Sequence, residues 1–163
     1  MTMNGSQISI NDPKSLLNLA DEEFQAILLE GVSRTFALTI PQLPAGLHPA
    51  VANAYLLCRI VDTIEDEVSL NVEQKKYFCS AFIDIVNSGN NAKAFAEELA
   101  PLLSDQTIPA EHTLIHLTAR VIEITHSFDP AQIEALATCV ETMAKGMPIF
   151  QALDLHAGVK TMA

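Results

Sequence analysis

Four polar side chains lie at helical spacing in an otherwise apolar stretch of the sequence. Residues 50–68 read AVANAYLLCRIVDTIEDEV, in which Tyr55, Arg59, Asp62 and Asp66 recur every three or four positions. At about 100° per residue these four fall within a sector of roughly 60° on a helix. Two carboxylates at i and i+4 have Cβ atoms about 5–6 Å apart. Because Mg²⁺ is typically held by one or two carboxylates together with substrate phosphates, the pattern predicts binding of magnesium and of a phosphorylated substrate.

Two further charged residues extend this site. Arg59 precedes Asp62 by one turn and can pair with it or contact a phosphate oxygen. Glu65 lies about 60° to the other side of Asp62 on the helical wheel. The alternative is a solvated acidic helix end, since Asp-x-x-x-Asp is common in helices. The apolar remainder of the segment argues against it, because a helix that is apolar nearly all round is buried and its charged edge must face water, cations or a lined cavity.

Helical spacing dominates the rest of the chain, and clean strand alternation is absent. We therefore expect an all-α architecture of about six helices in a single segment over residues 1–163, with residues 1–12 as a mobile arm. Start and stop signals place the helices from Asp21 to the break at Pro41 and Pro44, at about 49–67, 71–89 and 92–99, from Pro109 to about His126, and from Pro130 to about Lys145 or beyond.

Composition excludes several classes of protein. The chain has 163 residues, 49 % of them hydrophobic, and 9 Lys and Arg against 20 Asp and Glu give a net charge of −11. A surface this acidic repels phosphate backbones and anionic lipid, so we expect no nucleic-acid partner. No signal peptide and no long apolar run are evident, which indicates a cytoplasmic chain. Cys58, Cys79 and Cys139 form no C-x-x-C pair and are expected to be reduced thiols packed as small hydrophobes.

Other candidate sites are weaker. His112 and His116 have the i,i+4 spacing of a zinc pair, but the sequence offers no third ligand, so we expect a partly buried helical pair. Met143 and Met147 are expected to fill the core. The six glycines are scattered and form no phosphate-binding loop.

Three blocks of the sequence resemble the squalene/phytoene synthase family of head-to-head prenyl transferases, and more closely its squalene synthase branch. Residues 33–36 (SRTF) resemble the family's S-R-[ST]-F segment, residues 55–66 (YLLCRIVDTIED) its first aspartate-rich motif, and residues 143–147 (MAKGM) its Met-x-x-Gly-Met element. The form D-T-I-E-D is more typical of squalene synthases than of phytoene synthases. The blocks occur in the family's order within residues 21–150.

The resemblance implies the N-terminal part of an isoprenoid-synthase helical bundle with a central cavity. It implies that two molecules of farnesyl diphosphate are joined to presqualene diphosphate with Mg²⁺, and that NADPH reduces this product to squalene. The residues carried over by position are Asp62, Glu65 and Asp66 for the metal, Ser33, Arg34 and Arg59 for diphosphate oxygens, and Phe36 and Tyr55 near the reacting prenyl carbons. Asp62, Asp66, Arg59 and Tyr55 are the expected catalytic set.

The chain departs from the family in length. Its second aspartate-rich motif and its Tyr-x-x-x-Val-Ala-Gly block have no counterpart here, so the chain ends as if cut, and we expect it to be inactive alone and to self-associate through an uncovered apolar face. The NADPH site and any membrane anchor are expected outside this segment, and a peripheral position of the whole enzyme at a membrane stays open. The alternatives are a phytoene or dehydrosqualene synthase, or a non-catalytic helical interaction module.

Overall fold

Helix α4 lies at the centre of the fold. The computed structural model describes residues 9–44 and 46–157, with side chains described up to Lys145 except that of Pro41. Its elements are α1 (Pro13–Leu16), α2 (Asp21–Val32), α3 (Arg34–Thr39), η1 (Ile40–Gln42), α4 (His48–Asp66), α5 (Val72–Ser88), α6 (Ala92–Leu99), η2 (Ala100–Leu102), α7 (Pro109–His116), α8 (Thr118–Thr125) and α9 (Pro130–Ala157). This part of the chain contains no strand, which confirms the all-α prediction.

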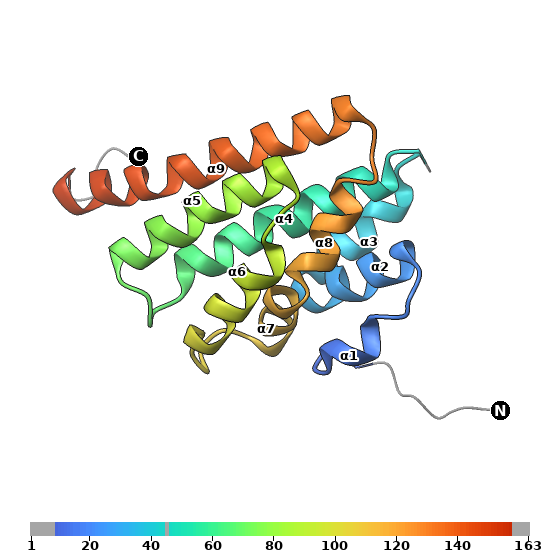
Figure 1. Cartoon of the computed structure of the whole chain (residues 1–163), viewed down its shortest axis with the longest axis horizontal. Helices are drawn as coiled ribbons and strands as arrows, with labels where there is room; N and C mark the ends of the chain where they lie inside the picture. The colour runs from blue at the N-terminus through green and yellow to red at the C-terminus, as the bar shows by residue number, and fades with distance from the viewer. Residues whose placement is uncertain (1–8, 45, 158–163) are drawn as a thin grey trace.

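The long helices α4, α5 and α9 pack against one another, and α2, α7 and α8 also contact α4 (Figure 1). The apolar sides of α4 are accordingly sealed: Leu56, Leu57, Ile60, Val61 and Ile64 are each 0 % exposed. Burying a side chain of this size stabilises the fold by about 1.5–3 kcal/mol. The residues of the predicted charged edge, in contrast, keep part of their surface exposed to solvent.

Two predicted helices are each divided in two. The helix expected from Asp21 to Pro41 ends at Val32, because Ser33 is extended (φ −161°) and its hydroxyl caps α3 by accepting a hydrogen bond from the Phe36 amide. The helix expected from Pro109 to His126 is interrupted at Leu117 (φ −102°, ψ 18°). There the buried Thr118 hydroxyl donates to the Ile115 carbonyl, a local bond that competes with the helical pattern.

Other boundaries agree with the sequence signals. Helix α5 begins and ends near the predicted bounds of 71 and 89: Asn71 and Gln74 form a capping box, and Gly89 ends the helix in the left-handed conformation (φ 80°). Helix α9 continues past Gly146 and Pro148 to Ala157.

The expected mobile arm is only partly described. Residues 1–8 lie outside the described residues, but Ile10 packs against the core and its carbonyl accepts a hydrogen bond from Thr113. Gly31 makes this approach possible, because a Cβ atom there would lie 2.9 Å from both Ile10 and Ala110. Ile10 therefore lies against α2 and α7, and the mobility of residues 1–12 stays a prediction.

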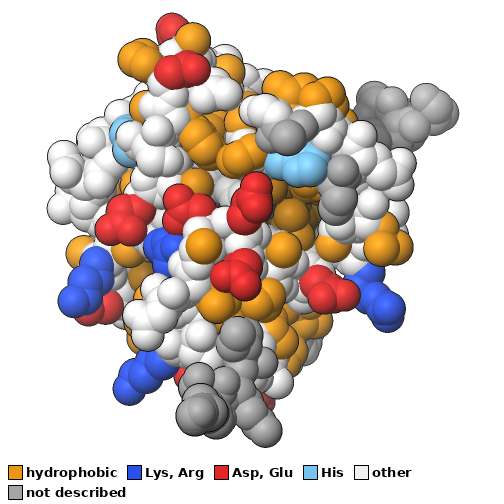
Figure 2. Space-filling view, turned by 90° about the vertical axis from the view of Figure 1, so that its right-hand side faces the viewer, with side chains coloured by type: hydrophobic (Ala, Val, Ile, Leu, Met, Phe, Trp, Pro, Cys, Tyr) orange, Lys and Arg blue, Asp and Glu red, His pale blue; other side chains and the backbone are white. Residues whose placement is uncertain are grey.

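Figure 2 views the molecule from the end where α2 begins, and acidic side chains gather near the middle of this view. Asp21, Glu22 and Glu23 are exposed in the first turn of that helix, where they interact favourably with its dipole. Among the described helices, none is long and apolar enough to cross a lipid bilayer.

A buried polar contact joins α4 to α8. Asn53 is 0 % exposed, and its side-chain amide donates to the Thr125 hydroxyl at 2.5 Å. On the α2 side, Gln25 donates to the Pro49 carbonyl at 3.0 Å and lies 3.4 Å from the Asn53 side-chain oxygen. These bonds satisfy amide groups that would otherwise be buried without partners.

We expect Asn53→Ala to lower the free energy of unfolding by about 1–3 kcal/mol, because Thr125 and Gln25 lose a buried partner and a small cavity remains. Urea denaturation measures this change. The matched control is Asn87→Ala on the exposed side of α5, where a shift within about 0.5 kcal/mol is expected. Equal shifts in the two variants would contradict a structural role for the buried amide.

Candidate functional site

The predicted charged edge of α4 runs along one side of the helix from its middle to its C-terminal end. Tyr55, Arg59 and Asp62 are half-buried, and Asp66 is exposed at the last residue of the helix. Solvent exposure therefore increases along the edge, from the half-buried Tyr55 to the exposed Asp66.

Arg59 is held by a residue that the sequence analysis did not identify. Its Nε and a terminal nitrogen both donate to one carboxylate oxygen of Glu111 on α7, at 2.8 and 2.5 Å. Burial alone would lower the pKa of Arg59, but the hydrogen bonds and charge of Glu111 raise it above its ordinary value. The guanidinium is thus fixed in orientation beside Asp62, and its charge is largely neutralised by Glu111.

The charges of the two aspartates are only partly balanced. Burial raises the pKa of Asp62 above its ordinary value, and the charge of Asp66 raises it further, although Arg59 partly offsets both effects. No ion pair joins either aspartate to a described Lys or Arg side chain. The half-buried Asp62 and the exposed Asp66 repel each other and are both hard oxygen donors, so this donor set fits a divalent ion such as Mg²⁺.

The same region does not supply a complete protein cage for a metal. Among the described residues, no group of three or more His, Cys, Asp or Glu side chains is placed to hold one ion. Mg²⁺ commonly takes its remaining ligands from water and substrate phosphates, so a two-carboxylate half-site agrees with that metal better than with zinc.

Glu65 lies apart from the two aspartates. Its side chain is 2 % exposed, and both carboxylate oxygens lack a hydrogen-bond partner among the described atoms. The Lys75 ammonium on α5 donates to the backbone carbonyl of Glu65 at 2.5 Å, not to its carboxylate. Burial raises the pKa of Glu65, and the charge of Lys75 counteracts this only in part. In this position Glu65 faces the protein interior and does not share the exposed edge with Asp66.

The aromatic residues of the predicted site lie together. The ring centroids of Phe36 on α3 and Tyr55 on α4 are 4.3 Å apart, and both side chains pack against the core. Ser33 is half-buried, and its hydroxyl is engaged at the start of α3, whereas Arg34 is exposed in the first turn of that helix. The fold thus brings Phe36 of α3 against Tyr55, which shares one side of α4 with Arg59 and Asp62.

The other candidate residues have structural roles. His112 is half-buried as expected, and its ring is bonded to the Ser104 carbonyl at 2.9 Å. His116 is exposed, so the expectation of a partly buried pair was wrong for this residue. Met143 packs against the core as expected, while the side chain of Met147 lies outside the described residues.

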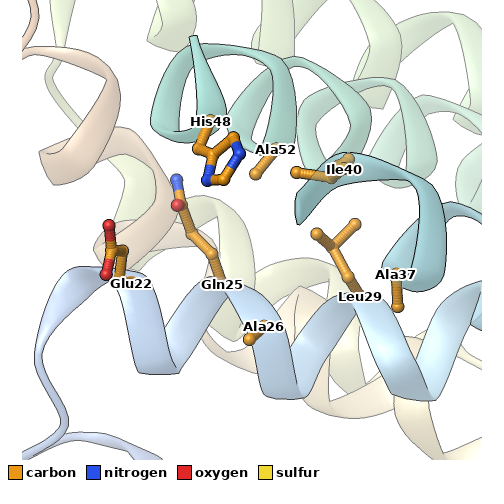
Figure 3. Close-up of a pocket in the computed structure, with 8 residues that line it drawn as sticks. All are labelled: Glu22, Gln25, Ala26, Leu29, Ala37, Ile40, His48 and Ala52. Carbon is orange, nitrogen blue, oxygen red and sulfur yellow. The ribbon is translucent and has the colours of Figure 1, made fainter. Parts of the chain in front are cut away.

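A small pocket lies elsewhere in the fold. It has a volume of about 190 Å³ and lies between α2, α3, η1 and the start of α4. Figure 3 shows Glu22, Gln25 and His48 together on one side of it, across from apolar side chains such as Leu29 and Ile40. Its lining includes none of the four residues of the charged edge, so it is not the cavity that the sequence predicts beside them.

Glu111 was missed because nothing in its local sequence marks it. It stands in the first turn of a short helix after Pro109, where an acidic residue is common for reasons of the helix dipole alone. Its partner Arg59 is 52 positions earlier. Only the packing of α7 against α4 brings the two together.

The chain is similar to proteins of one known family. The profile of the squalene/phytoene synthase family matches residues 29–147. The squalene synthase of Solanum lycopersicum is 46 % identical over 52 residues, which are 32 % of this chain and 13 % of that protein. The inactive squalene synthase 2 of Arabidopsis thaliana is 30 % identical over 123 residues, 76 % of this chain and 27 % of that protein. Squalene synthase BSS of Botryococcus braunii is 29 % identical over 142 residues, 85 % of this chain and 27 % of that protein.

The matched regions thus cover between 13 % and 27 % of these relatives. No solved structure matches the chain significantly. The family profile spans most of the described residues and includes the Phe36–Tyr55 pair, the Arg59–Glu111 pair and both aspartates. The chain belongs to the squalene/phytoene synthase family.

Proposed function

We propose that the protein is a magnesium-dependent prenyl transferase of the squalene synthase type. It joins two molecules of farnesyl diphosphate to presqualene diphosphate, and NADPH reduces this product to squalene. The observation that carries the proposal is the pair Asp62 and Asp66, whose charges Arg59 balances only in part because Glu111 also pairs with it. The names of the relatives in tomato and Botryococcus support the same reaction.

The leaving diphosphate determines which residue types are needed. Ionising an allylic diphosphate requires charge stabilisation on the leaving group, and Asp62 and Asp66 would hold the Mg²⁺ that supplies it. Arg59 donates to a diphosphate oxygen through the N–H groups that Glu111 leaves free, and its fixed orientation reduces the entropy lost on binding. Ser33 and Arg34, at the start of α3, are the further candidates for diphosphate contacts.

The carbocation that remains requires an apolar environment without nucleophiles, in contrast to the charged site of the leaving diphosphate. Phe36 and Tyr55 offer two neighbouring aromatic rings, tilted by 33°, and aromatic faces stabilise positive charge without reacting with it. Glu65 stays a third candidate metal ligand, on the condition that its side chain first turns away from α5.

NADPH is proposed for the reduction step on the resemblance of residues 33–36, 55–66 and 143–147 to the family. No glycine-rich phosphate loop is present among the six glycines of this chain.

One comparison favours a second candidate, a family member that keeps the fold without the activity. The Arabidopsis relative that matches 76 % of this chain carries the name inactive squalene synthase 2. A protein with a single acidic half-site could bind a prenyl diphosphate or another helical protein without catalysing prenyl transfer.

The test uses the protein as the cell makes it, incubated with radiolabelled farnesyl diphosphate and Mg²⁺, with and without NADPH. We expect presqualene diphosphate without NADPH, squalene with it, and no product after chelation of the metal. Dehydrosqualene formed without any reductant would assign the chain to the dehydrosqualene synthases instead. A folded protein that yields no coupled product under any of these conditions would support the non-catalytic candidate.

A further inference from the structure

Two cysteines that are remote in sequence lie next to each other in the structure. Cys58 on α4 and Cys139 on α9 are 81 positions apart, and their sulfur atoms are 3.9 Å apart. Helices α4 and α9 pack along each other, so this approach belongs to a well-packed interface between two long helices. The sequence alone indicated three isolated thiols, because no short spacing joins them.

The two thiols differ in their access to solvent. Cys139 is exposed and Cys58 is half-buried beneath it, whereas the third cysteine, Cys79 on α5, is buried. A small reagent can therefore reach Cys139 first. A disulfide requires the two sulfurs to be about 2.05 Å apart, so they must approach by about 2 Å, within the range of a side-chain rotation.

We propose that Cys58 and Cys139 form a reversible disulfide, and that the pair is a modification site for small-molecule disulfides of the glutathione class. The Cys139 thiolate attacks one sulfur of the reagent, forms a mixed disulfide and releases one molecule of thiol. Cys58 then gives its proton to solvent and attacks the Cys139 sulfur, which releases the second thiol. The protein loses two electrons and two protons, and the reagent disulfide gains them to become two thiols.

The surroundings of the pair set its reactivity. Burial raises the pKa of Cys58 to about 12, and the neighbouring Cys139 thiol and the charge of Asp62 act in the same direction. Cys58 is therefore a poor first nucleophile and the resolving member of the pair. The bond would tie α9 to α4 one residue before Arg59, and its formation does not depend on which reaction the protein catalyses.

The experiment equilibrates the purified protein in glutathione buffers of increasing oxidised fraction, followed by thiol counting under denaturing conditions and peptide mapping. We expect the number of free thiols to fall from three to one, a linkage between the peptides of Cys58 and Cys139, and full reversal by dithiothreitol. The melting temperature should rise on oxidation, because the bond closes a long loop of the unfolded chain.

Single substitutions distinguish this bond from non-specific oxidation. Cys79→Ser should still form the linkage and lose two thiols, whereas Cys58→Ser and Cys139→Ser should form no intramolecular bond and show no rise in melting temperature. Three free thiols retained under the most oxidising buffer, a linkage that includes Cys79, or a glutathione adduct on Cys139 that is never displaced by Cys58 would each overturn the proposal.

Discussion

Asp62→Asn, in the protein as the cell makes it, reduces the turnover of the prenyl diphosphate by about 100-fold or more. Each tenfold loss corresponds to about 1.4 kcal/mol of transition-state stabilisation, and the charge of a metal-bound leaving group is worth several kcal/mol. Asparagine keeps the size of the side chain but removes the negative charge that a hard cation needs. Initial rates measured over a range of Mg²⁺ concentrations should show the loss and a higher requirement for the metal.

The same variant should not be less stable than the wild type. The pKa of Asp62 is raised in the folded protein by burial and by Asp66, so its ionised form is less favourable in the folded state than in the unfolded state. Removing the charge relieves this repulsion, and the melting temperature is therefore expected to stay constant or to rise. Loss of activity without loss of stability is typical of a functional residue rather than a structural one.

Asp84→Asn is the matched control, because it removes one negative charge from the exposed side of α5. It should change neither turnover nor the magnesium requirement. If Asp62→Asn instead retained activity within a few-fold of the wild type, Asp62 would not be a metal ligand and the proposed half-site would be wrong.

The central helix could be predicted from sequence because its information is local. The apolar periodicity of residues 50–68 determines which sides of α4 are buried, and the residues left over are the charged edge. The capping box at Asn71 is equally local, since both of its partners lie within four residues. Patterns of this kind depend on helix geometry alone.

Features that depend on packing could not be predicted in this way. The angular position of Glu65 on a helical wheel is only 60° from that of Asp62, yet the neighbouring helix α5 covers one residue and leaves the other half open. Likewise, the sequence predicts Ser33 within a helix, whereas in the structure it is the extended residue that separates α2 from α3 and caps α3. The Arg59–Glu111 pair and the Cys58–Cys139 contact join residues more than fifty positions apart, for which a single sequence holds no signal.

A buried carboxylate immediately after the charged edge leads to the second large prediction. Glu67 is 1 % exposed, and its two oxygens accept hydrogen bonds from the Ser69 amide at 2.9 Å, the Ser104 amide at 2.9 Å and the Thr107 hydroxyl at 2.6 Å. Burial alone would raise the pKa of Glu67, but these donors lower it to about 2. The residue thus ties the end of α4 to the loop that leads into α7, the helix that carries Glu111.

Glu67→Gln should lower the free energy of unfolding by about 2–3 kcal/mol at neutral pH and the melting temperature by about 5–10 °C. The glutamine side chain is similar in size, but its amide nitrogen must face a donor, because all three contacts of Glu67 come from N–H or O–H groups. Chemical denaturation at pH 7 measures the change. Glu97→Gln, on an exposed position of α6, is the control and should shift stability by less than about 0.5 kcal/mol.

The pH dependence separates the charge of Glu67 from its shape. The folded-state pKa of about 2 lies below the ordinary value of 4.5, so between these values the unfolded chain binds more protons. The stabilisation by Glu67 is therefore complete above about pH 5 and is lost as the pH falls towards 2. The difference in stability between wild type and Glu67→Gln should shrink over the same interval, because the variant has no proton to gain. A difference that stayed constant from pH 7 to pH 3 would mean that the shape of the side chain, and not its charge, holds this loop and the start of α7 against α4.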